Sequence, residues 1–144
     1  MLIYSRFFLV LLTLPIQPGA FGCDPALQSA ECLQAAGYYD EAITEYKRFI
    51  FFNPESESAS FAYEKIALAY RAQKRWAESA AAMQQAIYLA TSDSVRNERQ
   101  LLYGIMLVAT GNLSLAELTF LKVQVYSQMP GLRKKAIFFR GIAC

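Results

Sequence analysis

The stretch Gly37-Tyr38-Tyr39-Asp40-Glu41-Ala42-Ile43 recurs, in altered form, twice further along this chain. The second copy is Lys74-Arg75-Trp76-Ala77-Glu78-Ser79-Ala80, and the third is Gly111-Asn112-Leu113-Ser114-Leu115-Ala116-Glu117. Each copy begins 37 residues after the one before it. A fixed period of roughly 20 to 50 residues is typical of proteins built as a stack of repeated units. Such a stack usually offers a binding surface in place of a catalytic centre.

Each unit has the pattern of two helices. In the first unit, Asp24-Pro25 is a helix start, with Asp as the N-cap and Pro at the first helical position. Gly37 is expected to end this helix, because glycine readily adopts the left-handed conformation that closes a helix. The apolar face of the second helix follows a helical spacing, and Asn53-Pro54 ends it. The third unit adds a candidate capping box at its second helix, formed by Ser114 and Glu117.

These residues resemble the tetratricopeptide repeat (TPR) family. The first unit matches through Gly37, Tyr39, Ala42, Tyr46 and Pro54. The second unit matches through Tyr63, Ala67, Tyr70, Trp76 and Ala86, and the third through Gly104, Gly111, Ala116 and Phe120. The resemblance implies an all-α fold, an α-solenoid of antiparallel helix pairs with about three repeats and one terminal helix.

The packing roles of the repeated positions agree with such a stack. Ala42, Ser79 and Ala116 are small, so we expect two helices to cross closely there. Tyr39, Trp76 and Leu113 are large and are expected to fill the space between neighbouring units. The period of 37 exceeds the family's usual value of about 34. We expect the added residues to lie in the loops around residues 54–58 and 92–94.

The repeats are predicted at about 23–56, 60–93 and 97–130, with a partial fourth at 134–144, so that the TPR-like domain spans residues 23–144. Adding one period to Gly104 gives Gly141, which places the last residues on the first helix of a fourth unit. The stretch Ala136-Ile137-Phe138-Phe139 is apolar on more than one face. A terminal helix should be polar on its outer side. We therefore expect one of three cases: the chain is a fragment of a longer repeat array, this C-terminal helix packs on another chain, by self-association, or on a membrane, or it only covers the third repeat.

The first 22 residues have the pattern of a signal peptide. Arg6 is the only charge before the apolar run Phe7-Phe8-Leu9-Val10-Leu11-Leu12, and Ala20-Phe21-Gly22 offers small residues at its first and third positions. This combination is typical of secretory export. The alternatives are an uncleaved membrane anchor and a buried helix.

Cys23 directly follows Gly22, which resembles the lipobox of bacterial lipoproteins. Ala20 and Phe21 depart from that pattern. The resemblance implies lipidation of Cys23 and membrane anchoring through it, and the competing interpretation is cleavage after Gly22 without a lipid. The long loops between repeats also resemble exported TPR lipoproteins of the cell envelope. We therefore expect an exported protein of the periplasm or cell envelope.

Composition argues against catalysis and against nucleic-acid binding. The chain has 144 residues, no histidine and a net charge of +2, and its longest basic run is Arg133-Lys134-Lys135. Without histidine the commonest general base and metal ligand are absent. We expect no enzyme activity, no cofactor, no metal and no nucleic-acid partner. Cys32 and Cys144 are expected to be buried, unpaired side chains.

The concave surface of the first helices is the predicted binding site. In the TPR family, four positions of each first helix line a groove that holds peptides. Carried over to this chain, the predicted groove residues are Phe61, Glu64, Leu68, Arg71, Glu98, Leu101, Ile105, Val108, Lys135 and Phe138. The predicted function is a scaffold that binds a peptide or partner protein. The alternatives are packing of these residues on the next repeat, and an oligomerising structural segment of a larger envelope assembly.

Overall fold

Residues 25–144 form seven α-helices and contain no β-strand in the computed structural model, which describes this part of the chain. The all-α solenoid expected from the sequence is therefore confirmed. The predicted signal peptide and Cys23 lie outside the described residues. The helices are α1 (Pro25–Ala35), α2 (Tyr39–Phe52), α3 (Glu57–Ala72), α4 (Trp76–Tyr88), α5 (Asp93–Ala109), α6 (Leu113–Tyr126) and α7 (Pro130–Ala143).

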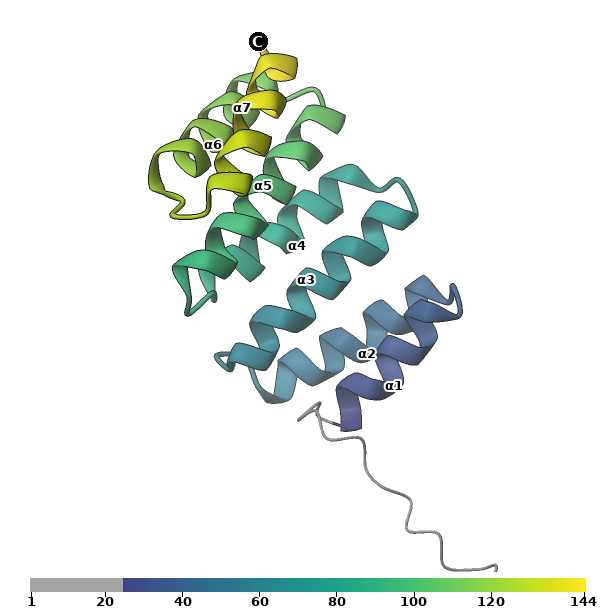
Figure 1. The fold of residues 1–144 in the computed structure, drawn as a ribbon. Helices are drawn as coiled ribbons and strands as arrows, with labels where there is room; N and C mark the ends of the chain where they lie inside the picture. The colour runs from purple at the N-terminus through teal and green to yellow at the C-terminus, as the bar shows by residue number, and fades with distance from the viewer. Residues whose placement is uncertain (1–24) are drawn as a thin grey trace, which may run out of the picture.

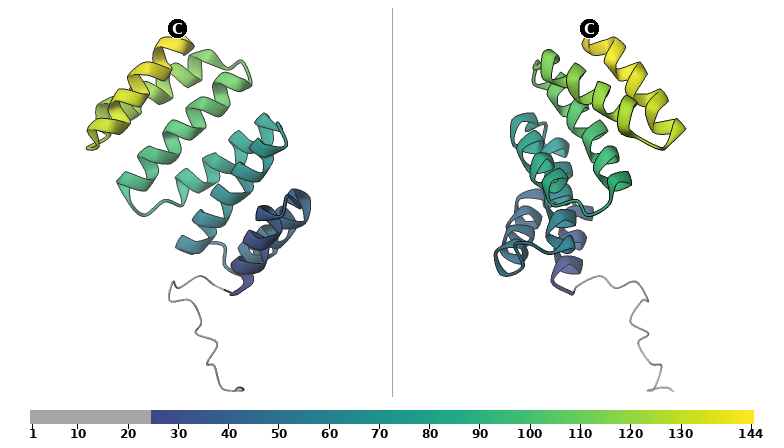
Figure 2. Two further views of the ribbon diagram at one scale, coloured as in Figure 1. Left: turned by 45° about the vertical axis from the view of Figure 1, so that its right-hand side comes forward. Right: turned by 90° about the vertical axis from the view of Figure 1, so that its left-hand side faces the viewer.

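The helices form three antiparallel pairs, α1–α2, α3–α4 and α5–α6, and α7 packs on the last pair. The turns within the pairs gather along one edge of the molecule, and the connections between successive pairs gather along the opposite edge (Figure 1). The pairs stack in one direction, so that α1 and α7 lie at opposite ends of the stack (Figure 2). Within the described residues, none of the helices combines the length and the apolar character that a membrane span requires.

The added residues of the 37-residue period lengthen helices instead of loops. α3 begins at Glu57 and α5 at Asp93, ahead of the repeat starts predicted at 60 and 97, and α7 begins at Pro130 instead of 134. The connections that remain are the short segments 53–56, 89–92 and 127–129. The start of α3 is set by Ser56, whose Oγ accepts a hydrogen bond from the backbone N–H of Ala59 at 2.9 Å. This cap satisfies an otherwise free N–H group, so the helix extends through residues expected in a loop.

The turns within the three pairs have the same geometry. Gly37, Lys74 and Gly111, one period apart, have positive φ angles of 86°, 60° and 80°. After each, a backbone N–H bonds to the carbonyl oxygen five residues earlier at 2.9 Å, from Tyr38 to Leu33, from Arg75 to Tyr70 and from Asn112 to Leu107. This is the Schellman pattern, in which a left-handed residue closes the helix. The prediction that Gly37 ends the first helix is confirmed.

The small residues lie where the helices of a pair cross. Ala42, Ser79 and Ala116 are completely buried, as expected. The Ser79 hydroxyl on α4 lies 2.7 Å from the carbonyl oxygen of Ala67 on α3. In the third pair Gly104 stands one period after Ala67, and a Cβ added to it would lie 2.5 Å from Phe120 Cε1. Close packing of this kind needs a side chain no larger than Ala or Ser at one of the two partners.

Four local expectations were wrong. Leu113 is exposed and does not fill the space between units, whereas Tyr39 and Trp76, the first residues of α2 and α4, are half-buried. Ser114 and Glu117 form no capping box, because Asn112 occupies the N-cap position of α6 and no side chain caps it. Cys32 and Cys144 are exposed free thiols. Cys32 lies on the outer side of α1, which no further helix in the described part of the chain covers.

The apolar core consists of two clusters that meet at α5. One cluster joins the first two pairs and reaches Met106 of α5. The other joins α5, α6 and α7 and includes Leu107, the next residue along the chain. Adjacent positions of a helix point in directions about 100° apart. α5 thus divides its side chains between the two clusters and connects the repeats.

Candidate functional site: the concave face and the hollow between α5 and α7

The predicted groove residues of α3 lie on the side of the stack formed by α1, α3 and α5. Phe61, Glu64 and Leu68 are half-buried, and Arg71 is exposed. The ammonium group of Lys65 lies 4.7 Å from the centre of the Phe61 ring and 3.4 Å from a carboxylate oxygen of Glu31 on α1. Phe61 therefore takes part in a contact between the first two pairs.

Glu64 is engaged by the next pair. Its Oε2 accepts a hydrogen bond from Nε of Arg99 on α5 at 2.7 Å. Nη1 of the same arginine also donates to the Ser60 hydroxyl at 2.5 Å and to the carbonyl oxygen of Ala86 at 2.9 Å. Arg99 is buried, so its charge is neutralised by Glu64 and its N–H groups are satisfied by α3 and α4. Glu64 therefore packs against the next repeat, which was the alternative to a role in peptide binding.

The groove residues of α5 and α7 converge on an open hollow of about 560 Å³. The predicted residues Leu101, Ile105, Lys135 and Phe138 all line it, and they are joined by Leu102, Lys134 and Phe139. The side chains of α5 lie on one side of the hollow and those of α7 on the other. Glu98 is exposed and Val108 half-buried, and neither lines this hollow.

The floor of the hollow is apolar and fixed, and its rim is basic. The Phe139 ring stacks on Phe120 of α6 at a centroid distance of 5.8 Å and meets Phe138 edge-on at 5.4 Å. Leu101 is only 6 % exposed, so it belongs to the core and supports the floor from below. Phe138, at 66 %, is open to solvent. Lys134 and Lys135 are exposed above this floor. The arrangement offers apolar contact together with two positive charges.

Sequence reasoning missed Leu102, Phe139 and Lys134. Leu102 and Phe139 are one period apart, as are Leu101 and Phe138. The repeat alignment could therefore have identified the pair Leu102 and Phe139 beside the pair that the family pattern indicated. Lys134 lies within the expected fourth unit, next to Lys135, but at a position outside the family's groove pattern.

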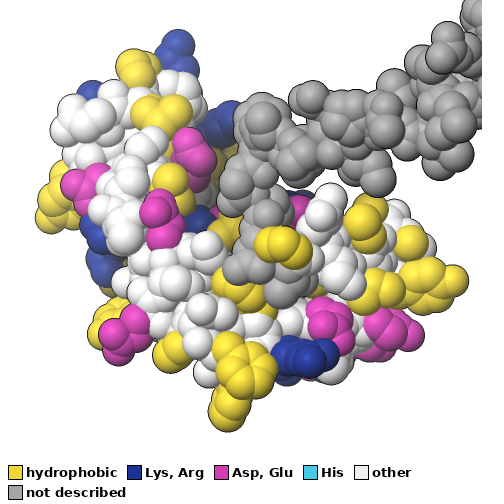
Figure 3. Space-filling model, turned by 90° about the horizontal axis from the view of Figure 1, so that it is seen from below, with side chains coloured by type: hydrophobic (Ala, Val, Ile, Leu, Met, Phe, Trp, Pro, Cys, Tyr) yellow, Lys and Arg dark blue, Asp and Glu magenta, His cyan; other side chains and the backbone are white. Residues whose placement is uncertain are grey.

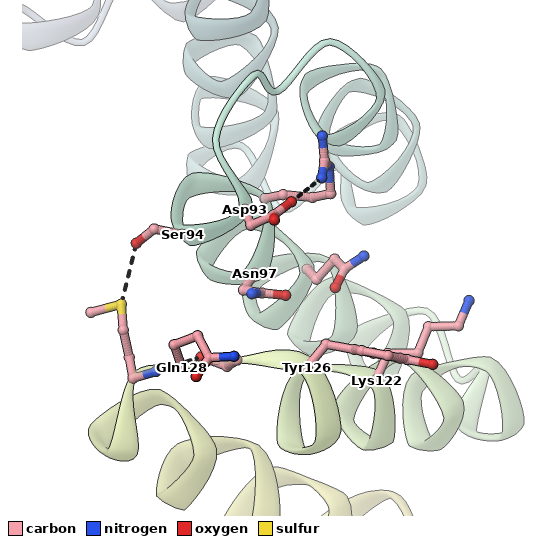
Figure 4. Close-up of a pocket in the computed structure, with 10 residues that line it drawn as sticks. Asp93, Ser94, Asn97, Lys122, Tyr126 and Gln128 are labelled. Carbon is pink, nitrogen blue, oxygen red and sulfur yellow. Dashed lines mark hydrogen bonds and ion pairs between the residues drawn. The ribbon is translucent and has the colours of Figure 1, made fainter.

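A second pocket, of about 440 Å³, lies at the other end of α5. Ser94 and Asn97 of α5 lie on one side, and Lys122, Tyr126 and Gln128 lie on the other (Figure 4). The Ser94 hydroxyl and the Met129 sulfur are 3.3 Å apart across its mouth, and Asp93 is paired with Arg96. The acid nearest to this pocket is therefore neutralised, and the lining offers polar contacts without an arrangement for proton transfer.

Elsewhere in residues 25–144, no group of side chains is arranged for catalysis or metal binding. The described side chains include no group of three or more His, Cys, Asp or Glu placed to hold a metal ion. Within the same residues, every buried side-chain polar atom has a hydrogen-bond partner. Burial raises the pKa of Tyr103 above its ordinary value, which keeps the phenol neutral. Its partial burial against both core clusters accounts for this shift.

The fold is similar to that of solved structures. The second TPR domain of the human RPAP3 protein, in complex with the HSP70 peptide SGPTIEEVD, is similar with a TM-score of 0.65 at 24 % identity, over 82 % of this chain and 91 % of that one. The chain has a TPR-type fold. The N-terminal domain of stress-induced protein-1 from C. elegans is similar with a TM-score of 0.61 at 20 % identity, over 81 % of this chain and 98 % of that one. No protein-family model matches the sequence, and neither does any curated protein.

Proposed function

We propose that this TPR-type domain is a protein-interaction scaffold that binds an acidic, partly apolar peptide segment in the hollow between α5 and α7. The observation that carries the proposal is the pairing of an apolar floor, Ile105 and Phe138, with two exposed lysines at its rim. Apolar grooves with a few placed polar groups are the usual form of a peptide site. The similar RPAP3 domain holds the peptide SGPTIEEVD, which combines apolar and acidic residues.

A labelled SGPTIEEVD peptide is a direct probe of this site. We expect it to bind with a Kd on the order of 10–100 µM, weakening as salt is raised, because two exposed charges contribute. Lys134→Glu with Lys135→Glu should weaken binding by at least roughly tenfold. Arg133→Glu is the matched control, since Arg133 is exposed on the same turn but does not line the hollow.

Two results would overturn the peptide site: no binding by the native chain at low salt, or equal binding by the lysine variant and the control. Fluorescence anisotropy with the labelled peptide gives both answers. Leu101→Asp is unsuitable as a variant, because Leu101 is part of the core and its replacement would unfold the site. Phe138→Ser removes apolar contact from an exposed position and is the better apolar test.

The proposed setting of this scaffold is the bacterial cell envelope, after export and with a lipid anchor at Cys23. The support is the sequence pattern of the first 22 residues and the Cys that follows them. Intact-mass measurement of the chain recovered from a bacterial membrane fraction tests this. A mass that begins at Cys23 with added acyl groups supports lipidation, one that begins at Cys23 without them supports cleavage alone, and an unprocessed chain in the cytosol overturns export.

A second candidate function is self-association through α7. Ile137, Phe138 and Ile142 are exposed on this helix, and a Cβ added to Gly141 would meet no atom within 4 Å. Contiguous exposed apolar side chains often mark an interface. Sedimentation of the chain at high concentration should then show a dimer that Phe138→Lys removes. A monomer at every concentration would eliminate this candidate.

A further inference from the structure

A set of apolar side chains outside the core also recurs at the repeat period. Phe51, Tyr88 and Val125 are separated by one period each, and they are 79 %, 81 % and 62 % exposed. Single exposed apolar residues are normal on a protein surface. Three at the same position of three successive units are not explained by chance exposure. We call Phe51, Tyr88 and Val125, with their exposed neighbours Phe52 and Tyr126, the aromatic edge.

Helix geometry explains why these side chains point outward. The core positions two residues earlier, Phe49, Ala86 and Val123, are buried. Two residues along a helix turn the side-chain direction by about 200°, which is nearly the opposite side. All three positions also lie at the C-terminal ends of α2, α4 and α6, at the connections between pairs. Those connections share one edge of the molecule, so the aromatic edge extends along the stack (Figure 1).

The N-terminal segment joins the fold at this same edge. α1 is antiparallel to α2, so Pro25 at the start of α1 lies at the end of the pair that carries Phe51 and Phe52. Cys23, the proposed lipidation site, lies two residues before Pro25 in the sequence. Figure 3 views the molecule from below relative to Figure 1, and hydrophobic side chains project there at several places among charged ones.

Charged side chains of both signs lie near the aromatic edge, so this edge suits a partner surface without net charge. Glu55, Glu57 and Asp93 are exposed on the connections or the helix starts beside it, and Arg48 and Lys122 are exposed on α2 and α6. Neither sign dominates, so electrostatic attraction to an anionic or a strongly basic partner is weak. Tyrosine, however, prefers the boundary between lipid headgroups and acyl chains, and phenylalanine is common on apolar faces that dip into this boundary.

We propose that the aromatic edge contacts the surface of a lipid bilayer, with Phe51, Tyr88 and Val125 inserted at the interface of zwitterionic lipids. A single weak anchor holds a protein on a membrane only reversibly, and stable attachment requires a second contribution. The aromatic edge supplies one contribution and the lipid proposed at Cys23 supplies the other, so this second contribution rests on the proposed lipidation. The stack then lies with its connections between pairs toward the lipid and its turns within pairs toward solvent. This proposal does not depend on peptide binding in the hollow between α5 and α7.

Tryptophan substitution tests the orientation directly. Tyr88→Trp places a fluorescent reporter on the aromatic edge, and Tyr38→Trp places one at a similarly exposed position on the opposite edge, each against the constant emission of Trp76. The full chain is mixed with phosphatidylcholine vesicles whose acyl chains carry bromine, which quenches tryptophan on contact. We expect a blue shift and quenching at position 88 and neither at position 38. Quenching at both positions or at neither overturns the proposal.

Partitioning supplies a second measurement. Phe51→Ser with Tyr88→Ser should lower the vesicle partition coefficient of the full chain by on the order of tenfold to a hundredfold. Tyr38→Ser with Leu113→Ser removes two exposed apolar side chains from the opposite edge and should change it little. Equal losses in both variants, or binding that appears only when phosphatidylglycerol is added, contradict the proposal. Concentration-dependent association that only the Phe51 and Tyr88 changes remove would assign the edge to a protein partner and overturn it.

A peptide-binding measurement on the same variants keeps the two proposals separate. Phe51→Ser with Tyr88→Ser should bind the SGPTIEEVD peptide as the native chain does, since neither residue lines the hollow. Loss of vesicle binding with unchanged peptide binding assigns the loss to the aromatic edge. Loss of peptide binding with unchanged vesicle binding assigns the loss to the hollow.

Discussion

Arg99 of α5 and Glu64 of α3 form a hydrogen-bonded ion pair of 2.7 Å that joins the second and third repeats. The arginine side chain is almost fully buried, and the glutamate side chain is about one quarter exposed. Breaking a buried pair by removing one partner leaves groups without their bonds. We expect Arg99→Ala to lower the free energy of unfolding by about 2–4 kcal/mol. Urea denaturation followed by circular dichroism measures this.

The control for that variant is Arg48→Ala. Arg48 is exposed and lies 3.9 Å from Glu45 on the same helix. Exposed pairs contribute little, so a change below about 0.5 kcal/mol is expected. If the two variants lose similar stability, the Arg99 network has no special role in holding the repeats together.

Lys74 has the left-handed conformation that Gly37 and Gly111 have in the other repeats. A side chain with a Cβ is strained there, whereas glycine is not. Lys74→Gly should therefore raise the free energy of unfolding by roughly 0.5–1 kcal/mol, and Gly111→Ala should lower it by about as much. Lys74→Ala keeps the strain while removing the charge. If the alanine variant gains as much stability as the glycine variant, charge and not conformation is the cause.

Gly104 and Gly141 occupy equivalent positions but have different surroundings. A Cβ at Gly104 would collide with the buried ring of Phe120, which cannot move freely because it is stacked on Phe139. Gly104→Ala should therefore lower the melting temperature, with a cost of about 1–3 kcal/mol. Gly141→Ala meets no atom and should be neutral or stabilising by up to roughly 1 kcal/mol.

The double variant Gly104→Ala with Phe120→Leu tests the reason for this difference. A smaller side chain at position 120 should recover part of the loss, because the collision is with the ring. Thermal unfolding measured by calorimetry would show it. Additive losses in the double variant would count against the collision.

Ionisation of the Glu78 carboxyl makes the free energy of unfolding depend on pH. Its pKa is lowered, first by hydrogen bonding to backbone N–H in the first turn of α4 and then by Arg75. A carboxyl whose pKa is lower in the folded state than in the unfolded state contributes stability above the unfolded value, and this contribution is lost as the pH falls through the folded value. The native chain should therefore exceed Glu78→Gln in stability at neutral pH, and the difference should disappear in acid. A difference that is constant with pH would contradict this assignment.

The repeat architecture was predictable because it depends on many weak signals at one spacing. The period, the turns at Gly37 and Gly111 and the small residues Ala42 and Ser79 all agree with each other. Helix starts were less predictable, because they depend on a single cap. Ser56 caps α3 in a stretch with loop-like composition, whereas Ser114, in a good capping pattern, lies inside α6.

The candidate site was predictable only at positions whose side chains form no hydrogen bond or ion pair with a neighbouring repeat. Position in the repeat alone assigned Ile105 and Phe138 to the predicted groove, and both residues line the hollow. Glu64 follows the same positional pattern, but its role depends on Arg99, which lies 35 residues away and has no counterpart in the pattern. Side-chain partners between repeats are long-range contacts, and a periodic pattern carries no information about them.

The division of the core at α5 has a consequence for how the molecule comes apart. In a stacked array, stability is the sum of contributions from units and from the contacts between neighbours. Because the clusters meet at adjacent residues, Met106 and Leu107, either half of the stack can lose its packing while the other keeps its own. Hydrogen exchange should then reveal two cooperative opening units, with α5 slowest to exchange because it belongs to both.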